Sequence, residues 1–266
     1  MNYGRKNASK QRERLSARSR KRRKRLTVRF FKGFLIFCLV AGIAGIIGGG
    51  LLFKKIIDDA PDITAEDIKP SAHKSTVYAN DGETVLATFV DAGSNRVYVP
   101  IDKIPEHLQN AFIAIEDARF REHNGIDFKG IVRAGVTGIM SGGNFSQGAS
   151  TITQQLIKNS IFEDFVNETQ IERVKRKIQE IYLAIQIEKE VGDKNIILEN
   201  YLNTINLGQN TLGVQSASQR YFGKDVSELT LSEGATIAGI TQSPGNLNPI
   251  TNPEANEKRR KKVLDD

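Results

Sequence analysis

The chain has 266 residues, of which 39% are hydrophobic and 26% charged, which is enough for one sizeable core and excludes a peptide hormone or a wholly disordered tail. A single cysteine, Cys38, excludes an internal disulfide, and three scattered histidines lack the spacing of a zinc site. The formal net charge is +7, but residues 1–32 hold 14 Lys and Arg against one acid, so the remaining 234 residues carry a net charge of −6. The basicity therefore belongs to the N-terminal tail.

Residues 33–53 form a run of 21 residues without a charge. As a helix this run would be about 31 Å long, which matches the hydrocarbon core of a bilayer. Its length and its basic flanks favour an uncleaved transmembrane helix over a buried core helix or a signal peptide. The Lys and Arg excess on its N-terminal side predicts that residues 1–32 are cytoplasmic and that residues 54–266 lie outside the cell membrane. We expect the tail to contact anionic lipid rather than nucleic acid, because no aromatic residues interleave its arginines.

Beyond the apolar run, the pattern predicts a mainly α domain preceded by a small β-hairpin or sheet. Asn80, Asp81 and Gly82 give a turn signal between two β-prone runs, 75–78 and 84–89, and residues 96–99 are expected to add a third antiparallel strand. Helical spacing begins after Pro105. The expected organisation is a basic tail (1–32), a transmembrane helix (33–53), a stalk (54–74), a β segment (75–102), the main domain (103–258) and the start of a helix or linker (259–266). Since residues 254–266 are helix-prone and show no stop signal, we expect a further C-terminal module.

One helical segment places a carboxylate between aromatic side chains. Phe112, Glu116 and Phe120 recur at i, i+4 and i+8. Burial disfavours a charged carboxylate unless the group is paired or used in chemistry, so Glu116 is a candidate general base. An ion pair of Glu116 with Arg119 or Arg121 at a helix end is an equally good interpretation of this segment alone.

A second segment, residues 148–155, follows a Gly-rich run and reads as the start of a Ser/Thr-rich helix. The unpaired N–H groups of such a helix start favour an anion such as a phosphate, and Lys158, one turn after Gln154, would reinforce this. Composition alone favours an ordinary helix cap by Ser150. The Gly-Lys-Ser/Thr ending of a P-loop is absent.

The third segment, residues 171–190, has a helical period that predicts a buried stripe of Ile171, Val174, Ile178, Ile181 and Ile185. A neighbouring stripe contains Arg173, Lys177, Glu180 and Ala184. Taken alone, Lys177 and Glu180 are an ordinary i, i+3 surface pair worth roughly 0.2 to 0.5 kcal/mol. If the neighbouring stripe faces Glu116, the site would combine two carboxylates with several cations, which suits attack by a hydroxyl with expulsion of a phosphate.

Together and in this order, these segments resemble the signature motifs of the family 51 peptidoglycan glycosyltransferases. This family comprises the polymerase module of class A penicillin-binding proteins and the monofunctional transglycosylases. The matching motifs are E-D-x-x-F-x-x-H-x-G at 116–125, G-x-S-T-I-T-Q-Q at 148–155 and R-K-x-x-E-x-x-x-A at 176–184, with Tyr-Leu-Asn at 201–203, Tyr-Phe-Gly at 221–223 and Gln-Ser-Pro at 242–244. The resemblance covers roughly residues 75–266.

The resemblance implies a lysozyme-like domain that polymerises lipid II into glycan strands at the outer membrane face. By this resemblance, Glu116 is the general base of an inverting transfer, and Glu180 is the second essential carboxylate, organising a cation cluster or a divalent metal, Mg²⁺ or Mn²⁺. The metal site itself is unknown. The apolar stretch 126–140 is similar to the family's membrane-dipping segment. The implied substrate-binding residues are Asp117, Phe120, His123, Ser150, Thr151, Gln154, Gln155, Lys158, Arg176, Lys177 and Asn203.

The implied partners are lipid II, the growing lipid-linked glycan chain, the membrane, and proteins of cell division or elongation. Two rival functions remain: a membrane-anchored lytic enzyme with a lysozyme-like fold, and a non-catalytic scaffold for cell-wall assembly. A glycosidase requires two carboxyl groups working on one bond. A transferase that expels a pyrophosphate needs one base and a basic cradle, which is what the motifs supply.

Overall fold

The computed structural model describes residues 3–70, 75–82, 84–89, 95–140, 148, 150–162 and 168–266. It divides into two compact units, residues 1–59 and 60–266. Part of the predicted stalk (71–74) and most of the Gly-rich run before residue 148 (141–147) lie outside the described residues.

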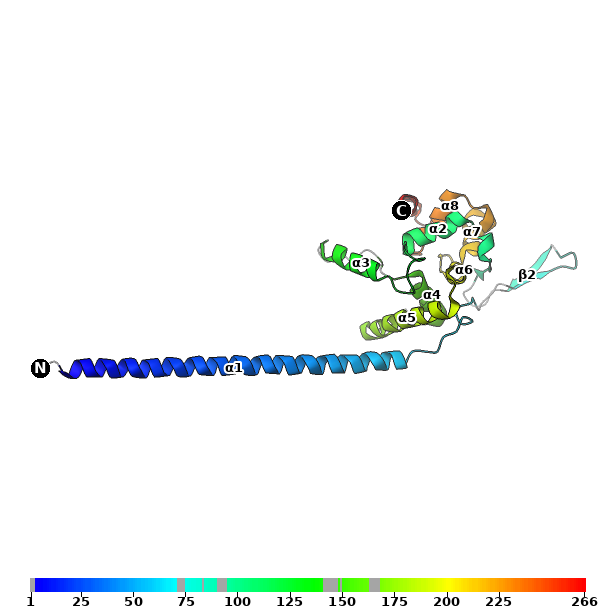
Figure 1. Cartoon of the computed structure of the whole chain (residues 1–266). Helices are drawn as coiled ribbons and strands as arrows, with labels where there is room; N and C mark the ends of the chain where they lie inside the picture. Colours follow the sequence, from blue (N-terminus) through cyan, green and yellow to red (C-terminus); the bar gives the residue numbers. More distant parts are fainter. Residues whose placement is uncertain are drawn as a thin grey trace. The chain divides into compact units, whose positions relative to one another are not determined.

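The first unit contains one helix, α1 (Tyr3–Asp58), drawn in blue in Figure 1. Its portion Phe30–Asp58 is long and apolar enough to cross a membrane, and its most apolar window has no buried side chain. The predicted transmembrane segment, 33–53, therefore lies inside a longer continuous helix.

The second unit begins with a hairpin of two antiparallel strands, β1 (Ser75–Tyr78) and β2 (Val85–Phe89), in which Val77 pairs with Ala87. The predicted turn joins them, where the Asp81 carboxylate accepts a hydrogen bond from the N–H of Thr84 at 2.9 Å. The expected third strand of this sheet is wrong. The short strand β3 (Asn95–Arg96) instead pairs in parallel with β4 (Thr211–Leu212), in a second two-stranded sheet.

The rest of the second unit is helical, so the expected mainly α fold is confirmed. The helices are α2 (Glu106–Glu116), α3 (Phe128–Met140), α4 (Ile152–Ile161), α5 (Gln170–Val191), α6 (Lys194–Thr204), α7 (Val214–Phe222), α8 (Leu231–Ala238) and α9 (Pro253–Asp265), with 3-10 turns at Ile101–Lys103 and Val226–Glu228.

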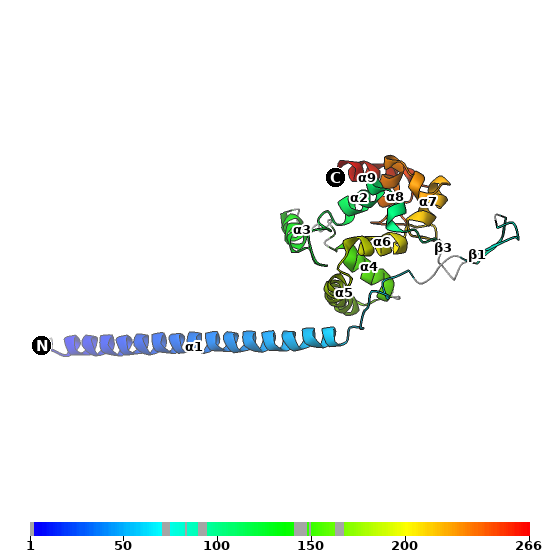
Figure 2. The same cartoon turned by 45° about the vertical axis from the view of Figure 1, so that its right-hand side comes forward.

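The core of this unit lies between two groups of helices (Figure 2). In one group α4 packs on α5 and α6, and in the other α2 packs on α8 and α9. Phe112 of α2 meets Tyr201 of α6 edge to face with ring centroids 6.2 Å apart, and both rings are fully buried. Burial of each such side chain contributes roughly 1.5 to 3 kcal/mol, so this contact fixes α2 firmly against α6.

Helix α5 begins and ends as its sequence dictates. Thr169 and Glu172 form a reciprocal capping box at its start, and Gly192 ends it with a φ of 65°. Its predicted buried stripe is wrong, however. Ile171, Val174 and Ile185 are exposed, while the buried positions are Gln179, Glu180, Leu183, Ala184, Ile187 and Glu188. The two buried carboxylates of this inward face are both paired, Glu180 with Arg176 and Lys177 of α5 itself and Glu188 with Thr153 of α4 and Lys194 of α6, which is why they tolerate burial.

Candidate active site

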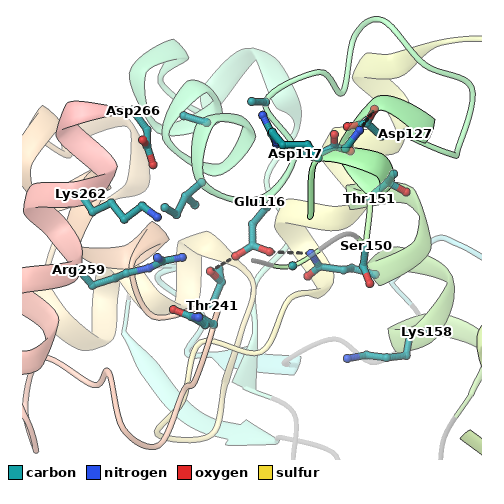
Figure 3. Close-up of a pocket in the computed structure, with 18 residues that line it drawn as sticks. Glu116, Asp117, Asp127, Ser150, Thr151, Lys158, Thr241, Arg259, Lys262 and Asp266 are labelled. Atoms are coloured by element: carbon teal, nitrogen blue, oxygen red, sulfur yellow. Dashed lines mark hydrogen bonds between the residues drawn. The ribbon is translucent and has the colours of Figure 1, made fainter. Parts of the chain in front are cut away.

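A pocket of about 830 Å³ opens where α2, α3, α4, the segment after α8 and α9 converge (Figure 3). Its lining includes Glu116 at the end of α2, Lys158 of α4, Thr241 after α8, and Arg259 and Lys262 of α9. The pocket therefore combines a carboxylate with cations supplied from opposite walls, α4 and α9.

Glu116 is held by hydrogen bonds to both of its carboxylate oxygens. The side-chain amide of Gln155 donates to Oε2 at 2.7 Å, and the Thr241 hydroxyl contacts Oε1 (Figure 3). The same hydroxyl lies 2.9 Å from the Ala238 carbonyl. With a single proton it donates to one of these acceptors at a time.

The orientation of Gln155 is set by a buried tyrosine. The Tyr201 hydroxyl donates to Oε1 of Gln155 at 3.4 Å, which directs the amide nitrogen of Gln155 towards Glu116. Burial, followed by the charges of Glu116 and Asp117, raises the pKa of Tyr201 well above its usual value. Tyr201 therefore stays protonated and remains a donor across the physiological pH range.

Asp117 links the end of α2 to the start of α4. Its buried carboxylate accepts from the backbone N–H of Ile152 at 3.0 Å and lies 2.9 Å from Nε2 of His123. The His123 ring in turn meets the buried ring of Phe120 edge to face, with centroids 6.4 Å apart. Of the three predicted substrate-binding residues in this motif, Asp117 lines the pocket, whereas Phe120 and His123 pack behind it.

Two predicted residues of the second motif hold the loop that carries Gly125. The Thr151 hydroxyl and the Gln154 amide both donate to the Gly125 carbonyl, at 2.9 Å and 3.0 Å. Gly125 has a φ of +83°, and a Cβ at this position would lie 2.7 Å from the Ala184 backbone. Only glycine fits this close approach to α5.

Thr151, rather than Ser150, caps helix α4. The Thr151 hydroxyl accepts from the N–H of Gln154 at 3.2 Å, so the expected cap lies one residue further along the chain. Ser150 instead accepts a hydrogen bond from Lys177 at 2.7 Å.

Two cations of α5 pair with one buried carboxylate. Glu180 is 2% exposed and accepts from Lys177 at 3.1 Å and from Arg176, which also binds Glu168 at 2.7 Å. Lys177 further donates to Oε1 of Gln154 at 3.0 Å. Glu180, Arg176 and Lys177 do not line the pocket themselves, but Lys177 reaches it through Ser150, which does. The predicted proximity of these charges to Glu116 is therefore indirect, because Lys177 contacts the pocket lining through Ser150, just before α4.

Lys158 lies in the pocket among these charges. Burial lowers its pKa, Arg176 and Lys177 lower it further, and Glu180 and Glu116 act in the opposite direction. A partly desolvated ammonium beside like charges favours an incoming anion, because an anion would relieve both the desolvation and the repulsion.

Asn203, by contrast, lies away from the pocket. It is fully buried, accepts from the N–H of Val99 at 2.8 Å and donates to the Val99 and Glu199 carbonyls at 2.8 Å and 2.9 Å. In this structure it ties the segment before α2 to α6.

Among the pocket residues that sequence reasoning did not name as site residues are Thr241, Arg259 and Lys262. Thr241 directly precedes the Gln-Ser-Pro motif at 242–244, and the two cations lie in a basic run at 258–262. Figure 3 shows Arg259 and Lys262 directed from α9 towards the side of the pocket that holds Glu116 and Thr241. The basic run and the motif were available signals, but neither indicates which of its residues face the pocket.

The donor set around Glu180 does not suit a divalent metal. Its two carboxylate oxygens already accept from Arg176 and Lys177, and two cations next to the carboxylate would repel a third. Within the described part of the chain, no group of three or more His, Cys, Asp or Glu side chains could hold a metal ion. The expected alternative in which Glu180 organises cations fits these contacts better.

Comparison with known proteins finds the transglycosylase family model over residues 82–266. Penicillin-binding protein 1A/1B of Bacillus subtilis (strain 168) is 39% identical over 246 residues, which cover 92% of this chain and 26% of that protein. Penicillin-binding protein 1A of Clostridium perfringens (strain 13 / Type A) is 40% identical, covering 89% and 34%. Penicillin-binding protein 1A of Escherichia coli (strain K12) is 41% identical, covering 89% and 27%. The chain thus spans between about a quarter and a third of the length of these relatives.

Proposed function

Because this chain belongs to the transglycosylase family, we propose that it is a peptidoglycan glycosyltransferase that polymerises lipid II into β-1,4-linked glycan strands. The observation that carries the proposal is the geometry of Glu116. Its carboxylate lies in the pocket, fixed by Gln155 and Thr241, with cations on the walls to either side.

In the proposed reaction, Glu116 takes the proton from the 4-hydroxyl of the acceptor sugar as this oxygen attacks the anomeric carbon of the donor. A new C1–O4 bond forms, and the bond from C1 to the pyrophosphate oxygen breaks. The configuration at C1 inverts, and undecaprenyl pyrophosphate leaves with the bonding electrons. No acid is required, since the leaving group already carries negative charge that cations can stabilise.

The cations for this step are proposed to come from α4 and α5. Lys158 would contact the pyrophosphate directly, because it lines the pocket and its ammonium is partly desolvated. Lys177 would act through Ser150 and Gln154, and Glu180 would keep Arg176 and Lys177 in place. A rigid, preorganised set of charges stabilises a developing charge without reorganisation during the reaction.

We further propose that α1 anchors the enzyme in the cell membrane, with residues 1–32 in the cytoplasm and the second unit outside. The apolar portion Phe30–Asp58 supplies the length, and the Lys and Arg excess before it supplies the orientation. A lipid-linked substrate requires an enzyme that stays at the bilayer surface.

The test is turnover of lipid II by the detergent-purified full chain, with polymer separated from released disaccharide. Glu116→Gln should abolish polymer formation while leaving the thermal unfolding temperature near that of the wild type. The matched control is Glu106→Gln, the same change at an exposed position in the first turn of α2, which should retain activity.

Two other outcomes would overturn the proposal. Release of cleaved glycan without polymer would identify a lytic enzyme. Absence of any turnover by a folded wild-type chain would favour a scaffold.

A further inference from the structure

Helix α9 presents two cations to the pocket that the protein itself leaves unpaired. Arg259 and Lys262 both line the pocket, on the side that holds Glu116 (Figure 3). Among the residues that the structure describes, neither cation makes a hydrogen bond or an ion pair, and Nε of Arg259 is buried without an acceptor. A buried N–H group without an acceptor has lost the hydrogen bonds that water would give it, so an incoming oxygen atom would stabilise it.

The position of Arg259 is fixed by packing at the end of α8. A Cβ added at Gly239 would lie 3.3 Å from Cγ of Arg259, so the stem of the arginine passes close over this glycine. Gly239 is two residues before Thr241, the partner of Glu116. The segment that orients the proposed base therefore also supports the arginine.

The cations of α5 differ from these two in being balanced inside the protein. Arg176 pairs with Glu168 and Glu180, and Lys177 pairs with Glu180. The lining on the α9 side includes one carboxylate, Asp266, which forms no ion pair with either α9 cation in the part of the chain that the structure describes. The side chains of this wall thus offer more positive than negative charge to a ligand.

The proposed transfer brings together two anionic substrates but expels a pyrophosphate from only one of them. In an inverting displacement, the nucleophile approaches the anomeric carbon from the face opposite the leaving group. With the pyrophosphate of the donor at Lys158, the acceptor approaches from the other side of Glu116, where Arg259 and Lys262 lie (Figure 3). The α9 cations are therefore placed to meet a charged group of the acceptor.

We propose that Arg259 and Lys262 form a subsite that binds an anionic group of the acceptor lipid II. The inference rests on the proposed glycosyltransferase function and adds a substrate contact to it. The acceptor carries two kinds of anion, its pyrophosphate and the carboxylates of its stem peptide. A guanidinium binds the oxygens of either group through parallel N–H donors, and the ammonium of Lys262 adds a second positive charge.

The test measures the formation of a single glycosidic bond, so that donor and acceptor are titrated separately. The donor is lipid II that lacks the 4-hydroxyl of its terminal sugar and therefore cannot attack. The acceptor is lipid II with a CH2 group in place of the oxygen on its anomeric carbon, which cannot leave. The variants are Arg259→Gln and Lys262→Gln in the full chain. The matched control is Lys258→Gln, the same change at an exposed lysine of α9 that does not line the pocket.

We expect each pocket variant to raise the KM for the acceptor about tenfold, which corresponds to one lost charge-assisted contact, and to leave the KM for the donor near that of the wild type. Lys258→Gln should change neither value. An unchanged acceptor KM in both variants, beside an active wild type, would overturn the inference and leave the proposed function intact. An equal rise in the donor KM would also overturn it. If Arg259→Gln fails to fold, the exposed Lys262 decides the matter. Absence of bond formation by the folded wild type would overturn both proposals.

A second acceptor, in which the stem-peptide carboxylates are blocked as amides, distinguishes the two sources of the anion. If the stem peptide is bound, blocking should raise the acceptor KM of the wild type to that of the variants and leave the variants unchanged. If the pyrophosphate is bound, the tenfold difference between wild type and variants should persist with the blocked acceptor. Either result supports the subsite, whereas an acceptor KM that responds to blocking but to neither substitution would overturn it.

Discussion

Thr241 and Glu116, which are 125 positions apart in the chain, meet through a contact between the threonine hydroxyl and one carboxylate oxygen. With Gln155 on the other oxygen, this contact fixes the carboxylate from both sides. Neither Thr241 nor Gln155 carries a charge. The orientation of the proposed base is thus set by two neutral hydrogen bonds from separate parts of the fold.

Thr241→Val removes the hydroxyl and keeps the shape of the side chain. We expect kcat for polymerisation to fall about tenfold, equivalent to roughly 1.4 kcal/mol, with a smaller change in KM, because the hydrogen bond orients the base rather than binding substrate. Thr241→Ser should restore most of the rate. Thr251→Val, the same change at an exposed threonine, serves as the control. Wild-type kcat in Thr241→Val would show that Gln155 alone orients the base.

Glu180→Gln tests whether the buried carboxylate holds the cation cluster together. Breaking a buried ion pair leaves its partners without compensation, so we expect a loss of about 3 kcal/mol in the free energy of unfolding, together with a loss of activity. Urea denaturation of the detergent-solubilised chain provides the measurement. Glu257→Gln disrupts an exposed i, i+4 pair with Lys261 and should leave stability unchanged. Equal stability of the two variants would argue against a structural role for Glu180.

Gly125→Ala tests the close approach between the first motif and α5. Alanine at a φ of +83° is strained by about 1 to 2 kcal/mol, and its Cβ would in addition lie 2.7 Å from the Ala184 backbone. Gly192→Ala is the matched control, since Gly192 also has a positive φ but its Cβ would point into open space. Thermal unfolding should show a clearly larger loss for Gly125→Ala. Similar losses in the two variants would mean that the loop of Gly125 can move away from α5 at a small cost in free energy.

The pH dependence of stability has one well-defined contributor in Glu233. A backbone hydrogen bond from Thr230, followed by a hydrogen bond from Lys224, lowers the pKa of Glu233 to about 2. Because the folded state lowers this pKa, the stabilisation is fully present above the unfolded pKa of roughly 4.5 and is lost as the pH falls towards 2. The unfolding temperatures of wild type and Glu233→Gln should therefore differ more at pH 7 than at pH 3. A difference that is the same at both pH values would contradict this assignment.

The sequence predicted the period of α5 correctly but not which face is buried. The isoleucine spacing is regular, yet hydrophobicity alone does not distinguish a stripe that packs on the core from one that faces outward. Part of the answer is tertiary pairing: Glu188 is buried beside Thr153 of α4 and Lys194 of α6, whereas Glu180 is paired with Arg176 and Lys177 of its own helix. The partners of Glu188 on α4 and α6 cannot be identified from the period of α5.

The candidate site shows the same division between local and long-range information. Glu116 could be proposed from its place between Phe112 and Phe120, because that signal lies within nine residues of sequence, although α2 ends at Glu116 and Phe120 lies in the turn that follows. Thr241 could not, since its contact with Glu116 depends on how the end of α8 packs against α2. His123 and Asn203 are polar residues in motifs, and both make internal hydrogen bonds in this structure, with Asp117 and with the N–H of Val99, which the motifs alone do not reveal.

The wide spacing of Glu116, Gln155 and Thr241 along the chain has a consequence for folding. Contacts of large sequence separation form late, because loop-closure entropy must be overcome before they contribute. Chains in which the individual helices have formed but not docked would therefore have an unoriented Glu116 and no reaction pocket. A small molecule that bridges Glu116 and Thr241 should accordingly slow global unfolding, because it links segments that separate only when the whole domain opens.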